Sequence, residues 1–191
     1  MQLILASASP RRRELLAAAG WSFVVDPVDA DERRHPGEPP ASYVERVARL
    51  KAAIGQSRHP EDAVLAADTC VVAGEDVLGK PEGQAQAAAM LKRLSGQSHT
   101  VLTGVALAWR GTVAAAVTET CVWFERLTPE EIDWYVASGE PFDKAGGYAI
   151  QGLASRFISR IEGSYANVVG LPVADVLHLL RNAGLEEQTA H

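Results

Sequence analysis

An almost unbroken apolar run near the middle of the chain, "AVLAADTCVV" at residues 63–72, constrains the fold most strongly. Such a run is typical of a strand that is covered on both faces of a sheet. Asp68 is its one charged residue. A buried carboxylate is costly unless it is paired, hydrogen-bonded or bound to a metal, so we interpret Asp68 as functional. A turn or helix-cap role at the strand end is the alternative.

Strand-like and helix-like segments alternate along the rest of the chain, which predicts an α/β fold. Extended segments are expected at 2–6, 21–25, 100–109 and 113–124, the last two as a hairpin. Helices are expected at 9–19, 41–56 and 85–94, and from Thr128 onward. Residues 156–172 are expected to form a strand, a glycine-rich turn and the start of a last helix that ends at Gly184.

The first predicted helix carries cations where helices usually carry acids. Its start, "SPRRR" at residues 9–13, has a typical cap and first position followed by three arginines. Each cation there costs about 0.3–1 kcal/mol, and the later start "TPEE" at residues 128–131 has glutamates instead. Free N–H groups beside guanidinium groups favour a phosphate site, and a solvated basic run is the alternative.

Other polar residues are ambiguous from sequence alone. Lys51 lies on the apolar stripe of the second helix, where it either serves a site or extends to water from the edge of the stripe. Lys80 lies in the turn "GKP", where a solvated lysine is the commoner case. Gln151 follows several glycines and offers an amide that could bind a base edge, whereas His99 is interpreted as structural.

Composition limits the class of protein. A chain of 191 residues that is 47% hydrophobic predicts one domain over 1–191, and its length also allows two lobes. A net charge of −6 argues against binding of duplex nucleic acid. The chain shows no signal peptide or membrane span, and Cys70 and Cys121 are expected to be reduced core residues, so we expect a cytoplasmic protein. Residues 185–191 are expected to be a frayed tail.

Eight features in chain order resemble the Maf family of nucleoside triphosphate pyrophosphatases over nearly the whole sequence: "LASASPRRRELL", "ADE", Lys51, "AADT", "GKP", "HTVLTG", "DKAGGYAIQG" and "NVVGLP". The resemblance implies a curved mixed sheet flanked by helices, with a nucleotide cleft between two lobes, as in inosine triphosphate pyrophosphatase. It also implies a homodimer.

The family cleaves nucleoside triphosphates between the α and β phosphates, which clears the nucleotide pool and requires a divalent metal such as Mg or Mn. By resemblance, Asp68 is the proton acceptor. Arg11, Thr69 and Gln151 match the three positions tied to substrate choice. These three residues resemble the dTTP and UTP subgroup more than the 7-methyl-GTP subgroup.

Further family positions surround the phosphates and the metal. Ser7, Arg12, Lys51 and Lys80 match the phosphate positions. Glu32 and Asp68 match the metal positions, and Asp31 stays an alternative to Glu32 because the loop around them is variable. A nucleotide-binding regulator of septum formation or cell division with little turnover is an alternative function. A phosphatase or kinase that acts on a terminal phosphate is another.

Overall fold

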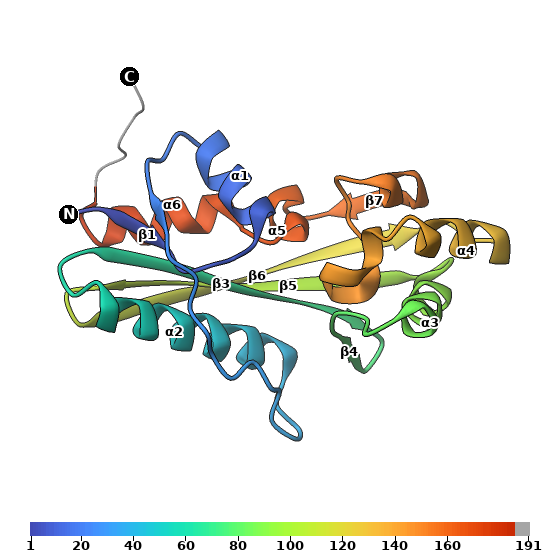
Figure 1. Cartoon of the computed structure of the whole chain (residues 1–191), viewed down its shortest axis with the longest axis horizontal. Helices are drawn as coiled ribbons and strands as arrows, with labels where there is room; N and C mark the ends of the chain where they lie inside the picture. The colour runs from blue at the N-terminus through green and yellow to red at the C-terminus, as the bar shows by residue number, and fades with distance from the viewer. Residues whose placement is uncertain (186–191) are drawn as a thin grey trace. The chain divides into compact units, whose positions relative to one another are not determined.

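The computed structural model describes residues 1–185, which form a mixed sheet flanked by helices (Figure 1). The strands are β1 (Leu3–Leu5), β2 (Val24–Val25), β3 (Ala63–Ala73), β4 (Asp76–Leu78), β5 (Ser98–Trp109), β6 (Thr112–Phe124) and β7 (Ile158–Glu162). The helices are α1 (Pro10–Ala18), α2 (Pro40–Arg58), α3 (Gln84–Leu94), α4 (Pro129–Ala137), α5 (Tyr165–Val169) and α6 (Val173–Asn182). The 3-10 turns are η1 (Glu140–Asp143), η2 (Ala145–Gly147) and η3 (Leu153–Phe157).

The sheet has seven strands in the order β2-β1-β3-β5-β6-β7, and β4 pairs with β3. Strand β1 runs parallel to both β2 and β3, whereas β4 is antiparallel to β3 and β7 is antiparallel to β6. The predicted α/β fold with a mixed sheet is therefore confirmed. Strand β3 lies between β1 and β5 and is buried along most of its length, as its apolar run predicted.

The chain divides into two compact units, each built from separate stretches of sequence. Among the described residues, the first unit contains Met1–Asp68, Thr103–Thr118 and residues 170–185. The second contains Thr69–Leu102 and Glu119–Val169. Strands β3, β5 and β6 therefore each contribute residues to both units.

Side-chain alternation along β1, β3 and β5 gives the first unit two apolar layers. Helix α2 lies on one face of these strands, and α1 and α6 lie on the other (Figure 1). The layer under α2 includes Ile4, Ala48, Ala52, Val64, Ala66 and Ala106. The opposite layer includes Leu5, Leu16, Leu65, Val105, Val176 and Leu179. Gly104 allows α2 to approach β5, because a Cβ atom there would lie 2.4 Å from the carbonyl oxygen of Val44.

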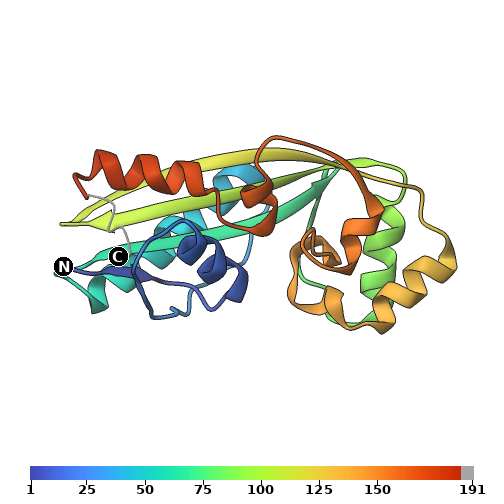
Figure 2. The same ribbon diagram turned by 90° about the horizontal axis from the view of Figure 1, so that it is seen from above.

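The second unit has its own core, in which α3 and α4 pack side by side (Figure 2). Large side chains of this core come from five different elements and loops: Leu91, Phe124, Tyr135, Tyr148 and Phe157. His99 lies among them with 3% of its surface exposed. Its Nε2 atom is 2.7 Å from the Tyr148 hydroxyl, and its ring contacts Phe124 edge-on. His99 is therefore structural, as expected.

Most predicted elements are present, with three corrections. The expected strand at 21–25 is only Val24–Val25, because that segment pairs with β1 at just two positions. Strand β4 was not predicted, since a strand of only three residues is too short to carry a periodic signal. A separate short helix, α5, precedes the last helix. The two helices are not continuous, because Pro172 lies between them and proline disfavours helical geometry in the residue before it.

The two cysteines and the helices of the described residues bear on the expectations drawn from composition. Neither Cys70 nor Cys121 forms a disulfide within residues 1–185; Cys70 is buried, whereas Cys121 is only half-buried and so is not a full core residue. No helix within residues 1–185 combines the length and the apolar character that a bilayer span requires. The expected frayed tail, apart from Leu185, lies outside the described residues.

Burial lowers the pKa of His99 to about 4. Because an unfolded histidine titrates near pH 6.5, the unfolded chain binds more protons between these values and gains stability as pH falls. We therefore expect the free energy of unfolding to fall by about 3 kcal/mol from this residue between pH 7.5 and pH 4.5. In urea unfolding, the free energy of unfolding should differ less between pH 7.5 and pH 4.5 for His99→Gln than for the parent protein. The exposed His178→Gln is the matched control, and equal differences in both variants would contradict the prediction.

Candidate functional site

Three charged side chains meet in the first unit. The Nζ atom of Lys51 is 2.9 Å from Oδ1 of Asp68 and 2.7 Å from Oε1 of Glu32. Lys51 and Asp68 are only 7% and 6% exposed, whereas about half of the Glu32 side chain is exposed. The buried position of Lys51 excludes the interpretation that it extends to water. Asp68 lies inside β3, which continues to Ala73, so a strand-end cap is also excluded.

The contact between Lys51 and Asp68 follows from helix and strand periodicity. Lys51 lies between Ala48 and Ala52, which belong to the apolar layer under α2. Ala66 of β3 is part of the same layer, and Asp68, two residues later, points to the same face of the strand. The lysine and the carboxylate therefore face each other across the layer between α2 and β3.

Burial raises the pKa of the Asp68 carboxyl, and the negative charge of Glu32 adds to this effect. The positive charges of Lys51 and Arg12 oppose it. A carboxylate with a raised pKa is a stronger base, and the adjacent cations keep a share of it ionised. Asp68 therefore has the environment that a general base needs.

Arg12 joins three separate parts of the first unit. Its Nε atom donates to the carbonyl of Gly170 at 2.8 Å, and its Nη1 atom donates to the carbonyl of Ala67 at 2.7 Å. The same Nη1 atom donates to the hydroxyl of the buried Ser7 at 3.3 Å. Arg12 thus links the first turn of α1 to the residue before Asp68 and to the chain that precedes α6.

The cations at the start of α1 have different environments. Ser9 caps the helix, as predicted, and no acidic residue lies in the first turn. Arg11 and Arg12 are half-buried, whereas Arg13 is exposed. Burial lowers the pKa of Arg12, the charges of Asp68 and Glu32 oppose this, and the charge of Arg11 adds to it. A solvated basic run therefore describes Arg13 but not its two predecessors.

The loop before α2 carries the two acidic candidates, Asp31 and Glu32, and only one of them contacts Lys51. Glu32 pairs with Lys51, as described, whereas Asp31 accepts hydrogen bonds from Arg33 at 2.9 and 2.7 Å. These bonds, with one from the backbone of Arg33, hold the pKa of Asp31 below its usual range. The carboxylate of this loop that lies at Lys51 is therefore that of Glu32.

Glu38, a residue that no sequence pattern indicated, holds the same loop in place. Its two carboxylate oxygens accept hydrogen bonds from Arg46 of α2 at 2.6 and 2.8 Å, and one of them accepts from the His35 amide at 3.0 Å. Arg46 also donates to the carbonyl of Arg33 at 3.0 Å. Hydrogen bonds from Arg46 lower the pKa of Glu38 to about 2. No motif in the sequence pairs these two residues.

The second unit holds the remaining predicted site residues. Thr69 follows Asp68 on β3 and is half-buried. Lys80 is exposed in the turn between β4 and α3, and the carbonyl of its neighbour Gly79 accepts a hydrogen bond from the Gly146 amide at 3.0 Å. Gln151 is exposed in the turn before η3, and its side chain makes no hydrogen bond to residues 1–185.

Within residues 1–185, no group of three or more His, Cys, Asp or Glu side chains could hold a metal ion. Glu32 and Asp68 offer two carboxylates on either side of one ammonium group. Mg²⁺ is usually bound through one or two protein carboxylates, together with waters and substrate phosphates. The donor set therefore suits Mg²⁺ or Mn²⁺ bound together with a phosphate ligand.

Comparisons with known proteins agree over nearly the whole chain. The family model described as "Maf-like protein" matches residues 2–183. A protein of Anaeromyxobacter dehalogenans named dTTP/UTP pyrophosphatase is 54% identical over 96% of this chain and 94% of its own length. Proteins with the same name are similar at 53% identity in Myxococcus xanthus, over 96% of this chain and 93% of theirs, and at 50% in Vibrio cholerae, over 94% and 96%.

A solved structure, that of the Staphylococcus aureus Ham1 protein, has the same fold. It matches with a TM-score of 0.50 at 12% sequence identity, over 96% of this chain and 100% of that one.

The buried pair in the first unit predicts a coupled effect on stability. Lys51→Met leaves the Asp68 carboxylate without its ammonium partner and should lower the free energy of unfolding by about 3 kcal/mol at pH 7. Asp68→Asn should lower the free energy of unfolding less in the Lys51→Met variant than in the parent protein. Urea unfolding of the parent, the two single variants and the double variant would measure this difference. The exposed Lys80→Met is the control and should change stability by less than about 0.5 kcal/mol. Additive costs would contradict the pairing.

Proposed function

Because the chain belongs to the Maf family, we propose that it is a nucleoside triphosphate pyrophosphatase that acts foremost on dTTP and UTP. The proposed reaction releases a nucleoside monophosphate and pyrophosphate. The names of its relatives support the substrate pair. The observation that carries the proposal is the buried carboxylate of Asp68, held on Lys51 and close to the charge of Arg12.

Asp68 is the proposed proton acceptor. A water molecule attacks the α phosphorus, a new P–O bond forms, and the bond from this phosphorus to the oxygen that bridges to the β phosphorus breaks. Pyrophosphate leaves with that oxygen, and the proton of the water passes to Asp68. The raised pKa of the Asp68 carboxyl supports this role, because a stronger base accepts the proton more readily.

The cations of the first unit are proposed to bind the phosphate chain. Arg11 and Arg12 extend from the first turn of α1, where the helix dipole also favours an anion. Lys51 is buried next to Asp68 and would neutralise negative charge as it develops. The buried hydroxyl of Ser7 adds a neutral hydrogen-bond donor at the same place.

Three roles rest on the family resemblance. Lys80 is proposed to contact a phosphate group, and its exposed position in a turn is compatible with that role. Thr69 and Gln151, together with Arg11, are proposed to select the base. The Gln151 amide, which has no hydrogen-bond partner among residues 1–185, supports this, since an amide can both donate to and accept from the edge of a base.

Glu32 and Asp68 are proposed to hold a divalent metal ion, Mg²⁺ or Mn²⁺. Such an ion, when bound, neutralises charge on the phosphates. A carboxylate that binds the metal fully is a weak base, so metal binding and proton acceptance are alternative roles for Asp68. Lys51 positions both carboxylates through the two ion pairs described above.

The products identify the reaction. Purified protein with Mg²⁺ or Mn²⁺ is incubated with dTTP, UTP, CTP, GTP and 7-methyl-GTP, and the products are separated by chromatography. We expect monophosphate and pyrophosphate, formed fastest from dTTP and UTP. Diphosphate and orthophosphate would place the cleavage at the terminal phosphate and overturn the proposal. Tight binding without turnover would favour a nucleotide-binding regulator instead.

Asp68→Asn tests the proton acceptor. The amide keeps the shape of the side chain but cannot take a proton at neutral pH, so we expect turnover to fall by a factor of about 10²–10⁴. Circular dichroism should show the fold retained. Asp62→Asn, an acid at the end of another loop, is the control and should keep turnover. Parental turnover in Asp68→Asn would exclude it as the base.

A further inference from the structure

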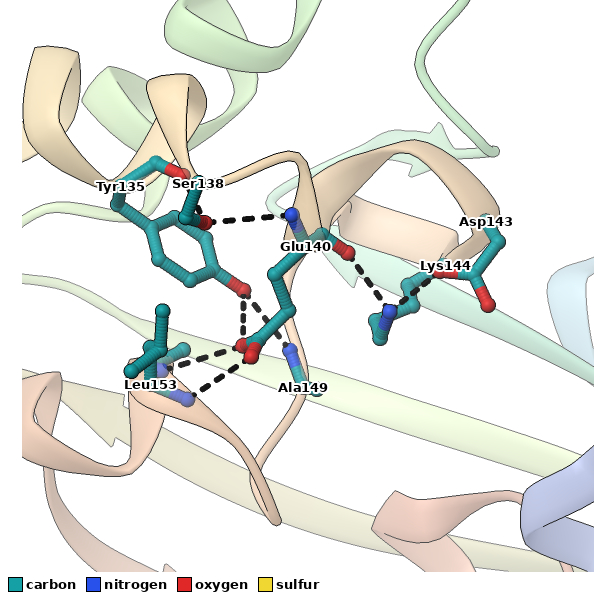
Figure 3. Close-up of polar contacts among 8 residues, drawn as sticks. Tyr135, Ser138, Glu140, Asp143, Lys144, Ala149 and Leu153 are labelled. Atoms are coloured by element: carbon teal, nitrogen blue, oxygen red, sulfur yellow. Dashed lines mark hydrogen bonds and ion pairs between the residues drawn. The ribbon is translucent and has the colours of Figure 1, made fainter.

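One carboxylate, that of Glu140, holds the backbone of the two residues at positions 153 and 154, shortly after Gln151. Figure 3 shows its contact with Leu153. Its Oε2 atom accepts a hydrogen bond from the Leu153 amide at 3.0 Å, and Oε1 accepts from the Ala154 amide at 3.4 Å. Oε1 also accepts from the Tyr135 hydroxyl at 2.8 Å. The turn that carries Gln151 is therefore tied directly to a single side chain, which the sequence analysis did not identify.

Tyr135 extends this contact to the other side of the turn. Its hydroxyl accepts a hydrogen bond from the Ala149 amide at 3.2 Å while it donates to Glu140. The tyrosine is fully buried in the core of the second unit. Burial, and secondarily the bond to Glu140, raises the pKa of Tyr135, so the phenol stays protonated and remains a donor. Residues 149, 153 and 154 are thus held through two linked side chains.

The backbone of Glu140 is itself held by two hydrogen bonds. Its amide donates to the Ser138 hydroxyl at 3.2 Å, and its carbonyl accepts from Nζ of Lys144 at 2.7 Å. Lys144 also pairs with Asp143. Figure 3 shows this chain of contacts leading from Lys144 to the carboxylate of Glu140. The Glu140 side chain therefore extends from a backbone position that is itself fixed by hydrogen bonds.

The chemistry of the site requires a carboxylate at position 140. The Tyr135 hydroxyl and the Leu153 and Ala154 amides all donate hydrogen bonds to the Glu140 side chain, and a carboxylate only accepts. A glutamine amide would turn an NH₂ group toward one of these donors. Gly152 makes room for the charge, because a Cβ atom there would lie 2.2 Å from Oε2 of Glu140.

We propose that Glu140 is a positioning residue for base selection: it fixes residues 149–154 so that Gln151 presents its amide in one place. Because the Gln151 side chain makes no hydrogen bond to the described protein, the backbone of this turn sets where the amide lies. Glu140 itself does not contact the base. The inference rests on the proposed role of Gln151 in substrate choice.

Glu140→Gln tests the proposal with two readouts. We expect faster hydrogen exchange at the Leu153 and Ala154 amides. We also expect the ratio of kcat/KM for dTTP to kcat/KM for CTP to fall by about tenfold, the worth of one hydrogen bond, mainly through a higher KM for dTTP. Glu75→Gln, an exposed glutamate of the same unit, is the control and should leave both readouts and the unfolding midpoint unchanged.

Two further variants keep the test valid if Glu140→Gln folds poorly. Gly152→Ala should displace the carboxylate and give the same loss of selectivity, and this loss should not grow when Glu140→Gln is added. Tyr135→Phe removes the hydroxyl that holds the Ala149 amide and should lower selectivity in the same direction.

Gln151→Ala separates this inference from the function on which it rests. If Gln151→Ala lowers selectivity while Glu140→Gln and Gly152→Ala do not, the inference is overturned and the role of Gln151 stands. If none of these variants alters selectivity but dTTP is still cleaved, both the role of Gln151 and the inference fall. If no triphosphate is cleaved by the parent protein, the proposed function itself has failed.

Discussion

The ion pair between Lys51 and Asp68 is the constraint on which the first unit depends. A carboxylate inside an apolar strand and a lysine on an apolar helix stripe would each be costly alone, because neither side chain is more than 9% exposed. Their mutual contact fixes how α2 lies against β3, and the small residues Ala48, Ala52 and Ala66 around them let the two elements come close. A pair buried in this way is weak evidence for stability, since hydrophobic residues of similar volume often replace such pairs without loss. Its presence here is easier to explain by chemistry than by folding.

Sequence patterns predicted the helices and strands that are determined by interactions between residues close together in the chain. The caps at Ser9 and Thr128, the apolar period of α2 and the apolar run of β3 all appear as expected. The departure of the first helix from ordinary charge placement and the charge inside β3 correctly indicated where unusual contacts would lie. What the sequence did not show are the contacts between distant residues of irregular segments, such as Glu38 with Arg46 or Glu140 with the amides of the following turn. These depend on the course of the backbone, which no periodicity or spacing encodes.

Both units use the same physical device to hold an irregular segment that carries a candidate residue. In the first, Glu38 receives two bonds from Arg46 and one from a backbone amide, and the loop so held carries Glu32. In the second, Glu140 receives backbone amides directly, and the turn so held carries Gln151. Loops lack the repeating hydrogen bonds of helices and strands, so their amides need other acceptors. A carboxylate can accept several bonds at once and therefore orders more backbone than a neutral side chain of similar size.

The division of the chain into two units has a consequence for synthesis. The polypeptide passes from one unit to the other between residues 68 and 69, 102 and 103, 118 and 119, and 169 and 170. Neither unit is a continuous stretch, so neither can be cut out as a fragment or complete its core while the ribosome still holds the chain beyond it. Val176 and Leu179, which cover one face of the first strands, are synthesised long after those strands. The nascent protein must therefore keep the apolar side chains of β1 and β3 from aggregating until α6 has been made.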